Sequence, residues 1–210
     1  MKKGIIFDMD GTLWDSAAGV AESWNEAILA YGYERKPLTA GDIQSVMGKT
    51  MEDIADILFP ELNVMQRKEL LDLCCRLEND YLRRHGGVLY PDIRKTMEKL
   101  KVNYHLYIVS NCQDGYIEAF IKAHHMEKYF EDTECWGRTR LSKGESNKIL
   151  IARNHLKNPI YVGDTAGDYQ SAVDAGIPFV YAAYGFGEVQ DCAYEIQSIR
   201  ELPKVLERVQ

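Results

Sequence analysis

Short apolar runs separated by longer amphipathic stretches dominate the pattern along this chain. Residues 4–7, 106–109, 159–162 and 179–181 are rich in β-branched and aromatic residues and are too short for helices, so they predict buried parallel strands. Helical periodicity fills the intervals, in residues 91–101, 116–125, 145–156, 167–175 and 199–209. This alternation predicts an α/β fold with a doubly wound parallel sheet.

Residues 16–85 break the alternation because they contain only helical patterns. Val20, Trp24, Ala27, Ile28 and Tyr31 fall on one helix face. Capping residues and glycines predict helices at about 16–31, 39–47, 51–59 and 64–84. We therefore expect an all-helical cap in residues 16–85, inserted into a core made of residues 1–15 and 86–210.

Composition narrows the class of protein. The net charge of −7 without a long Lys/Arg block argues against a nucleic-acid partner. No apolar run can span a membrane, and the run after Lys3 stops at Asp8, too early for a signal peptide. Five cysteines without a CxxC pair favour a reducing compartment. We expect a soluble cytoplasmic protein that binds no membrane, and the oligomeric state stays open.

Polar side chains gather where three of the expected strands end. They are Asp8 and Asp10, Ser110 and Asn111, and Asp164 with Asp168 one helical turn later. Each group alone is compatible with ordinary turn or cap chemistry. Ligands of open α/β sheets bind at the carboxyl ends of the strands, so the recurrence at these ends favours a functional site.

Two carboxylates as close as Asp8 and Asp10 repel each other unless a cation or a proton intervenes. A cluster that offers only oxygen ligands favours Mg²⁺ over Zn²⁺. The strand ends therefore predict a magnesium-dependent site.

The same residues resemble the motifs of the haloacid dehalogenase (HAD) superfamily. Residues 7–13, Phe-Asp-Met-Asp-Gly-Thr-Leu, are similar to its first motif. Residues 109–111 resemble the second motif, and residues 163–168, Gly-Asp-Thr-Ala-Gly-Asp, resemble the fourth. The motifs occur in the family's order and cover nearly the whole chain. The helical insertion is similar to the C1-type cap of the phosphoglycolate phosphatase-like branch, on a Rossmann-like core.

The third motif of that family supplies a lysine, and this chain offers two. Lys143 lies in the expected loop before a helix, although Gly144 stands where the branch usually has proline. Lys148 is the alternative, but it falls inside the expected helix. A lysine in a loop reaches the strand ends more easily, so we favour Lys143.

The resemblance implies roles for these residues. Asp8 would be the nucleophile that forms an aspartyl-phosphate, and Asp10 the general acid and base. Mg²⁺ would be held by the carboxylates of Asp8 and Asp164 and by the backbone carbonyl of Asp10. Asp168 would contact the metal ligands and not the metal itself, or it would orient Lys143.

Three further residues would bind the substrate. Ser110 and the backbone amide of Asn111 would hold a phosphoryl oxygen, while Lys143 would balance the negative charge of the nucleophile and the phosphate. Lys49 lies in a Gly-Lys-Thr turn that lacks both the first glycine and the strand of a P-loop. By the resemblance it would close over the site and contact the leaving group, and a solvated lysine in a turn is the alternative.

Together these features predict a Mg²⁺-dependent phosphatase that hydrolyses a small phosphorylated metabolite and resembles phosphoglycolate phosphatases. A sugar phosphomutase or an inorganic pyrophosphatase could use the same core, and a catalytically silent binding protein could share the fold. The physiological substrate is not determined by the core motifs.

Overall fold

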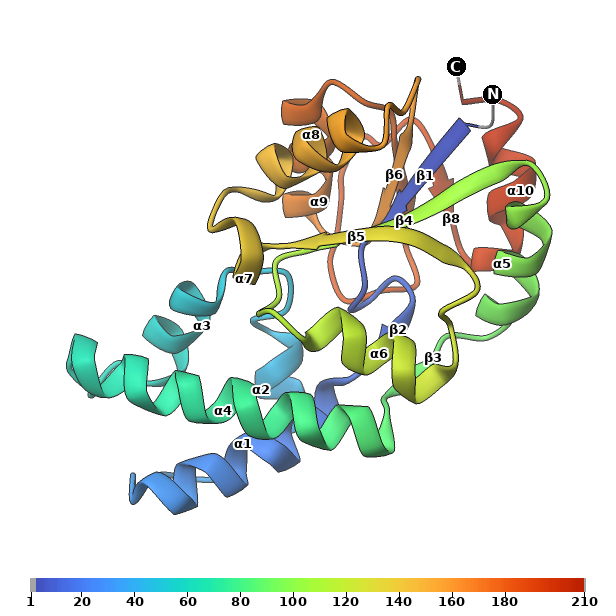
Figure 1. Cartoon of the computed structure of the whole chain (residues 1–210). Helices are drawn as coiled ribbons and strands as arrows, with labels where there is room; N and C mark the ends of the chain where they lie inside the picture. The colour runs from blue at the N-terminus through green and yellow to red at the C-terminus, as the bar shows by residue number, and fades with distance from the viewer. Residues whose placement is uncertain (1–2, 210) are drawn as a thin grey trace.

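A six-stranded parallel sheet forms the centre of the computed structural model, which describes residues 3–209 (Figure 1). Its strand order is β5-β4-β1-β6-β7-β8. The bounds are Lys3–Phe7 (β1), Tyr104–Ser110 (β4), Phe130–Cys135 (β5), Ile160–Gly163 (β6), Phe179–Ala182 (β7) and Glu195–Ile196 (β8). The predicted doubly wound α/β fold is confirmed.

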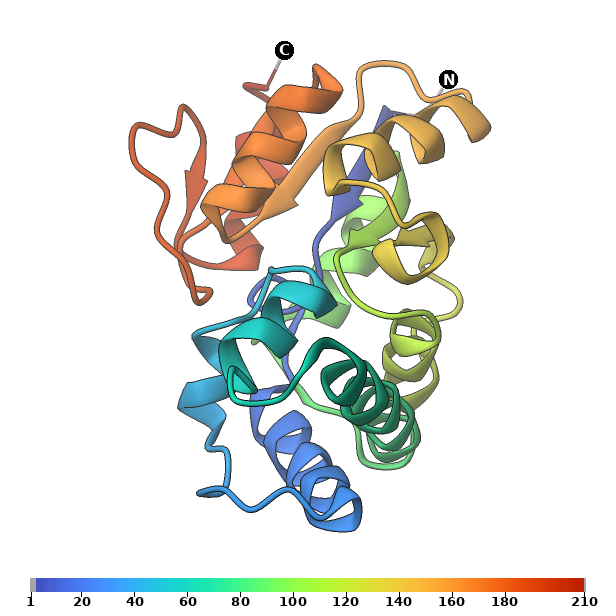
Figure 2. The same ribbon diagram turned by 90° about the vertical axis from the view of Figure 1, so that its left-hand side faces the viewer.

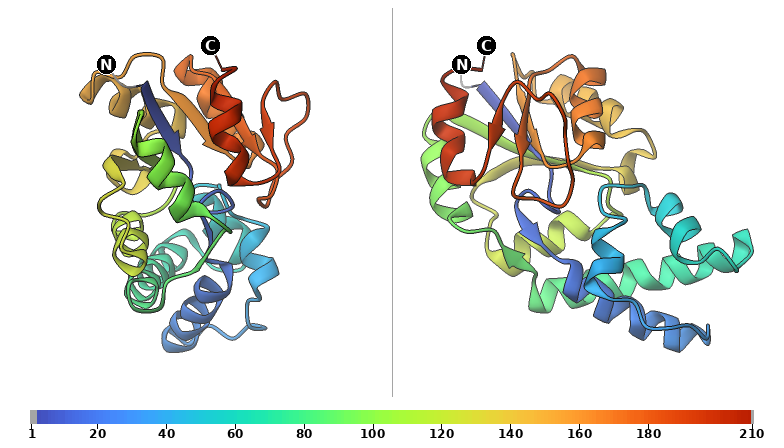
Figure 3. Two further views of the ribbon diagram at one scale, coloured as in Figure 1. Left: turned by 90° about the vertical axis from the view of Figure 1, so that its right-hand side faces the viewer. Right: turned by 180° about the vertical axis from the view of Figure 1, so that it is seen from behind.

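Alternating side chains divide the core between the two faces of the sheet. Ile5 and Phe7 of β1 belong to one hydrophobic cluster, whereas Ile6 belongs to the other. Helices α5 (Ile93–Lys101) and α10 (Leu202–Leu206) cover the first face, and α8 (Lys143–Arg153) and α9 (Ala166–Ala175) cover the second (Figure 3). Burial on both faces explains why the central strands are continuous apolar runs.

The three strands that carry the motifs are neighbours. Strand β1 pairs with β4 on one side and β6 on the other, and Phe7 lies opposite both Ile108 and Val162. Because the pairing is parallel, the segments that follow these residues all leave the sheet on the side where the strands have their carboxyl ends. Asp8 therefore emerges between the ends of β4 and β6.

The helical segment faces this edge of the sheet. Helices α1 (Ala17–Tyr31), α2 (Ala40–Gln44), α3 (Met51–Leu58) and α4 (Val64–His85) lie together, with α1 and α4 side by side (Figures 1 and 2). Its two ends join the core through the antiparallel strands β2 (Trp14–Asp15) and β3 (Val88–Leu89). The division into a core and a cap at residues 16–85 stays a prediction.

Several elements differ from the sequence-based expectation. Strands β5 and β8 were not predicted, because β5 is a polar sequence at an edge of the sheet and β8 has only two residues. The expected C-terminal helix is a 3₁₀ turn, Ile199–Glu201, followed by the short α10. Helix α8 begins two residues earlier than expected and helix α2 ends earlier. A short helix, α7 (Trp136–Thr139), follows β5.

None of the helices within residues 3–209 has the length and apolar character that crossing a membrane requires.

Candidate active site

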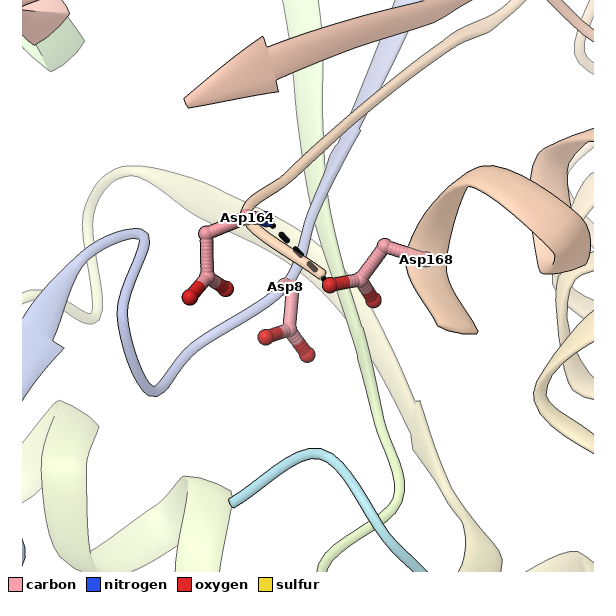
Figure 4. Close-up of side chains that lie close together, drawn as sticks. All are labelled: Asp8, Asp164 and Asp168. Atoms are coloured by element: carbon pink, nitrogen blue, oxygen red, sulfur yellow. Dashed lines mark hydrogen bonds between the residues drawn. The ribbon is translucent and has the colours of Figure 1, made fainter. Parts of the chain in front are cut away.

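Three buried carboxylates converge at the edge where β1 and β6 end. Asp8 follows β1, Asp164 follows β6, and Asp168 lies in the first turn of α9 (Figure 4). One oxygen from each lies within 4.8 Å of the others, and all three side chains are buried. Such a concentration of negative charge is unstable unless cations balance it.

Lys143 supplies part of that balance. Its Nζ atom donates hydrogen bonds to Asp8 Oδ1 at 2.7 Å and to Asp168 Oδ1 at 2.6 Å. The expected loop position was wrong, because Lys143 is the first residue of α8, after the N-cap Ser142. The alternative, Lys148, is exposed and pairs with Glu145. The structure thus brings Lys143, and not Lys148, to the carboxylates.

Asp168 is held entirely by protein donors. Its Oδ2 atom accepts bonds from the backbone amides of Asp164 and Thr165 and from the Thr165 hydroxyl. Its Oδ1 atom accepts from Lys143 and, at 3.3 Å, from Tyr161. This leaves Asp168 poorly suited to bind a metal directly, and well suited to orient Lys143 and the loop after β6.

The site has the properties of a divalent-cation site. Burial, and next the charge of Asp168, raise the pKa of Asp164 to about 7. Burial and Asp168 likewise raise the pKa of Asp8 well above its ordinary value, against the opposing effect of Lys143. A cation between Asp8 and Asp164 would reverse both shifts, and carboxylate oxygens suit Mg²⁺.

The loops around Asp164 fit it closely. Gly11 has a φ of 85°, and a Cβ atom at this position would lie 2.0 Å from Asp164 Oδ2, so only glycine is compatible. The backbone amide of Phe186 donates to the same oxygen at 2.8 Å. Residues 185–187, in the loop after β7, therefore pack against Asp164.

Asp10 is held by two hydroxyl groups that the sequence did not reveal. Ser16 Oγ donates to Asp10 Oδ1 at 2.5 Å, and Tyr116 OH donates to the same atom at 2.8 Å. Ser16 is the N-cap residue of α1, yet its side chain makes no capping bond. Burial raises the pKa of Asp10 to about 6 although both hydroxyls oppose the shift. No local pattern marks Ser16 or Tyr116 as partners of Asp10.

A cavity of about 50 Å³ lies between the strand ends and the helical segment. Asp8, Asp10, Ser110 and Asn111 line its sheet side, and the exposed Lys49 lies at the loop between α2 and α3. The side-chain amide of Asn111 donates to the Gly48 carbonyl at 2.8 Å, which fixes this loop over the site. The predicted substrate-binding residues are therefore brought to one cavity.

Comparison with known proteins agrees with this arrangement. A family model described as haloacid dehalogenase-like hydrolase matches residues 5–182. The chain belongs to this family. The match spans all the strand ends that form the site, and it confirms the predicted superfamily and the prediction of an enzyme.

A curated relative indicates the branch of the family, and solved structures share its fold. A phosphoglycolate phosphatase of Rhodobacter capsulatus is 28% identical over 194 residues, covering 89% of this chain and 86% of that protein. A HAD-like hydrolase structure from Streptococcus pneumoniae has a TM-score of 0.83, with 22% identity and 98% coverage of both chains. A Rhodobacter sphaeroides protein solved with xylulose 1,5-bisphosphate has a TM-score of 0.77 at 15% identity, covering 96% of both chains. At these identities the solved structures show the shared fold alone.

Proposed function

We propose that this HAD hydrolase is a Mg²⁺-dependent phosphatase that cleaves a small phosphate monoester through an aspartyl-phosphate on Asp8. The placement of Lys143 carries the proposal, because its contact occupies Oδ1 of Asp8 and none of the described residues donates to Oδ2. Asp8 lines the cavity, so that oxygen is the candidate nucleophile. The phosphoglycolate phosphatases among the relatives support phosphate monoesters as the substrate class.

The reaction would divide between two carboxyl groups. Asp8 Oδ2 attacks phosphorus, the ester P–O bond breaks, and Asp10 gives its proton to the leaving oxygen. Asp10 then takes a proton from water, which attacks phosphorus and releases phosphate and free Asp8. Ser16 and Tyr116 orient Asp10 for both steps. The Ser110 side chain and the backbone amide of Asn111 would hold phosphoryl oxygens, and Lys143 would balance the negative charge of these oxygens.

Mg²⁺ would be bound by the carboxylates of Asp8 and Asp164 and by the backbone carbonyl of Asp10. When bound, it supplies positive charge that stabilises the phosphoryl oxygens and offsets the repulsion between the carboxylates. The protein's own part is to fix these ligands, through the Gly11 turn and the Phe186 amide.

The free state of all five cysteines supports a reducing compartment. We therefore place the protein in the cytoplasm, with small phosphorylated metabolites as its partners.

Phosphate release from p-nitrophenyl phosphate and from a panel of metabolites tests the proposal. We expect turnover with Mg²⁺. The rate should fall at least about 100-fold after EDTA treatment and recover when Mg²⁺ is restored. If neither the nitrophenyl ester nor any metabolite is hydrolysed with Mg²⁺, the phosphatase proposal is wrong. Phosphate returned to a sugar instead of water would favour a mutase.

Asp10→Asn should separate the two chemical steps. Nitrophenolate leaves without protonation, so the first step should persist, while hydrolysis of the aspartyl-phosphate slows by about 10²–10⁴-fold without the base. Rapid mixing should then show a burst of nitrophenolate equal to the enzyme concentration, followed by slow turnover. Alkyl phosphates should give no burst. Equal slowing of both steps would contradict the role given to Asp10.

A further inference from the structure

Two cysteines that the proposed mechanism does not use lie next to the phosphoryl-binding residues. Cys112 follows Ser110 by two positions, lines the active-site cavity and is 8% exposed. Cys135 is the last residue of β5, where it lies opposite Ser110 in the parallel pairing with β4, and it is fully buried. The two cysteines therefore belong to the ends of neighbouring strands, although they are distant in the sequence.

Side-chain contacts connect the phosphoryl-binding serine to an arginine through both cysteines. The Cys112 thiol makes hydrogen-bond contacts with the Ser110 hydroxyl and with the side chain of Cys135. Arg138, in α7, donates from Nε to the Cys135 sulfur at 3.3 Å. Arg138 is held in turn by an ion pair with Glu134 at 3.3 Å. The two sulfur atoms are therefore neighbours, and one of them lies beside a positioned guanidinium group.

The two thiols differ in acidity and in access. Hydrogen bonds from Cys112 and then from Arg138 lower the pKa of Cys135 to about 7. Burial raises the pKa of Cys112 well above its ordinary value. Since thiols in contact titrate as a pair, a proton can pass from Cys112 to Cys135. A small solute in the cavity thus meets the Cys112 sulfur first, and Cys135 supplies the negative charge of a thiolate.

We propose that Cys112 and Cys135 form a reversible disulfide when the protein meets a hydroperoxide. On the basis of the phosphatase function proposed above, this disulfide disables the phosphoryl-binding site. A reactive cysteine with a second thiol beside it is the arrangement of redox-sensing proteins. Disulfides of this transient kind also form in reducing compartments, where cellular thiols restore the reduced state.

The oxidation takes place in two steps. The proton of Cys112 passes to Cys135, and the Cys112 sulfur attacks a peroxide oxygen. The O–O bond breaks, leaving a sulfenic acid on Cys112 and a hydroxide ion that takes the proton from Cys135 to form water. The Cys135 thiolate then attacks the Cys112 sulfur, the S–O bond breaks, and the released hydroxide takes a proton from solvent. The two sulfurs together lose the two electrons that the peroxide gains.

The disulfide would displace the residues that bind phosphate. It holds the two sulfurs about 2 Å apart, closer than any hydrogen-bond contact, and so pulls Cys112 away from Ser110. The Cys112 carbonyl accepts from the Gly137 amide at 3.0 Å, and a Cβ atom on Gly137 would lie 2.1 Å from a backbone nitrogen of the same loop. This tight packing leaves little room to absorb the movement, which therefore reaches the adjoining amide of Asn111. A displacement of about 1 Å at such a group can cost about 100-fold in rate.

Hydrogen peroxide treatment of the Mg²⁺-loaded protein, followed by thiol blocking and peptide mapping, tests the site directly. We expect a Cys112–Cys135 crosslink in the treated wild type and its loss after dithiothreitol. Phosphate release from an ester that the untreated protein hydrolyses should fall at least about tenfold with the crosslink and return with the reductant.

Cys135→Ser tests the need for the second thiol, because it removes the sulfur with little change in size. Peroxide should then form no crosslink and should leave a sulfenic acid on Cys112 that dimedone traps. Cys192→Ser is the matched control, since Cys192 is more exposed than Cys112 and does not line the cavity. Its crosslink and its loss of activity should match those of wild type.

The outcomes separate this proposal from the general one. A wild-type map without the Cys112–Cys135 crosslink would overturn the proposal, and so would the crosslink together with undiminished phosphate release. Equal inactivation of wild type and Cys135→Ser, reversed by dithiothreitol in both, would overturn it as well. The wild-type map decides whether the disulfide forms even if Cys135→Ser does not fold. It also needs no turnover, so a protein that hydrolyses no ester would contradict the phosphatase function separately.

Discussion

Asp8→Asn should abolish turnover, by on the order of 10⁴-fold or more, while leaving the protein folded. The amide oxygen is a poor nucleophile, so no aspartyl-phosphate can form, and the loss should appear in kcat. The pKa of Asp8 is raised well above its usual range by burial and Asp168, so its charged form is disfavoured in the folded protein. Removing that charge should relieve repulsion with Asp164 and Asp168.

Two measurements check this expectation together. Phosphate release gives the loss of activity, and thermal unfolding in EDTA should show that metal-free Asp8→Asn unfolds at the same or a higher temperature than metal-free wild type. Asp80→Asn serves as the control, since Asp80 is exposed on α4 and pairs with Arg83 at the surface. Retained activity in Asp8→Asn would rule out its role as the nucleophile.

Lys143→Ala should impair both stability and catalysis. Its ammonium group is the hydrogen-bonded cation between Asp8 and Asp168, at 2.7 and 2.6 Å, and is buried with them. Removing one partner of a buried ion pair costs about 3–5 kcal/mol, because the remaining charges are left uncompensated. We expect the free energy of unfolding to fall by that amount and kcat to fall by about 10²–10³-fold.

Lys148→Ala is the matched control, because it removes the same group from the same helix. Lys148 is exposed and pairs with Glu145 one turn away, a contact worth less than about 1 kcal/mol. Chemical denaturation and phosphate release should therefore both resemble wild type. An unchanged kcat in Lys143→Ala with a reduced kcat in Lys148→Ala would assign the third motif to Lys148.

Most of the fold could be predicted because the central strands are buried on both faces. Strands β1, β4, β6 and β7 need continuous apolar runs, and such runs are visible in the sequence. Strand β5 lies at an edge of the sheet, where polar residues such as Glu131 and Asp132 are tolerated. Pairing with β4, rather than its own composition, makes this segment a strand.

The sequence by itself determined the chemical inventory of this protein: carboxylates after two strands, a serine at the end of a third, and a cap-like helical insertion. The local spacing of these residues was enough to predict that they form one site, because the carboxyl ends of parallel strands lie on the same side of the sheet. Only the tertiary structure decided which lysine reaches Asp8, which hydroxyls hold Asp10, and that Glu78 enters the cavity. Glu78, on helix α4, lies 70 positions after Asp8 along the chain. Contacts at such separation depend on how the helices pack, and no local pattern records them.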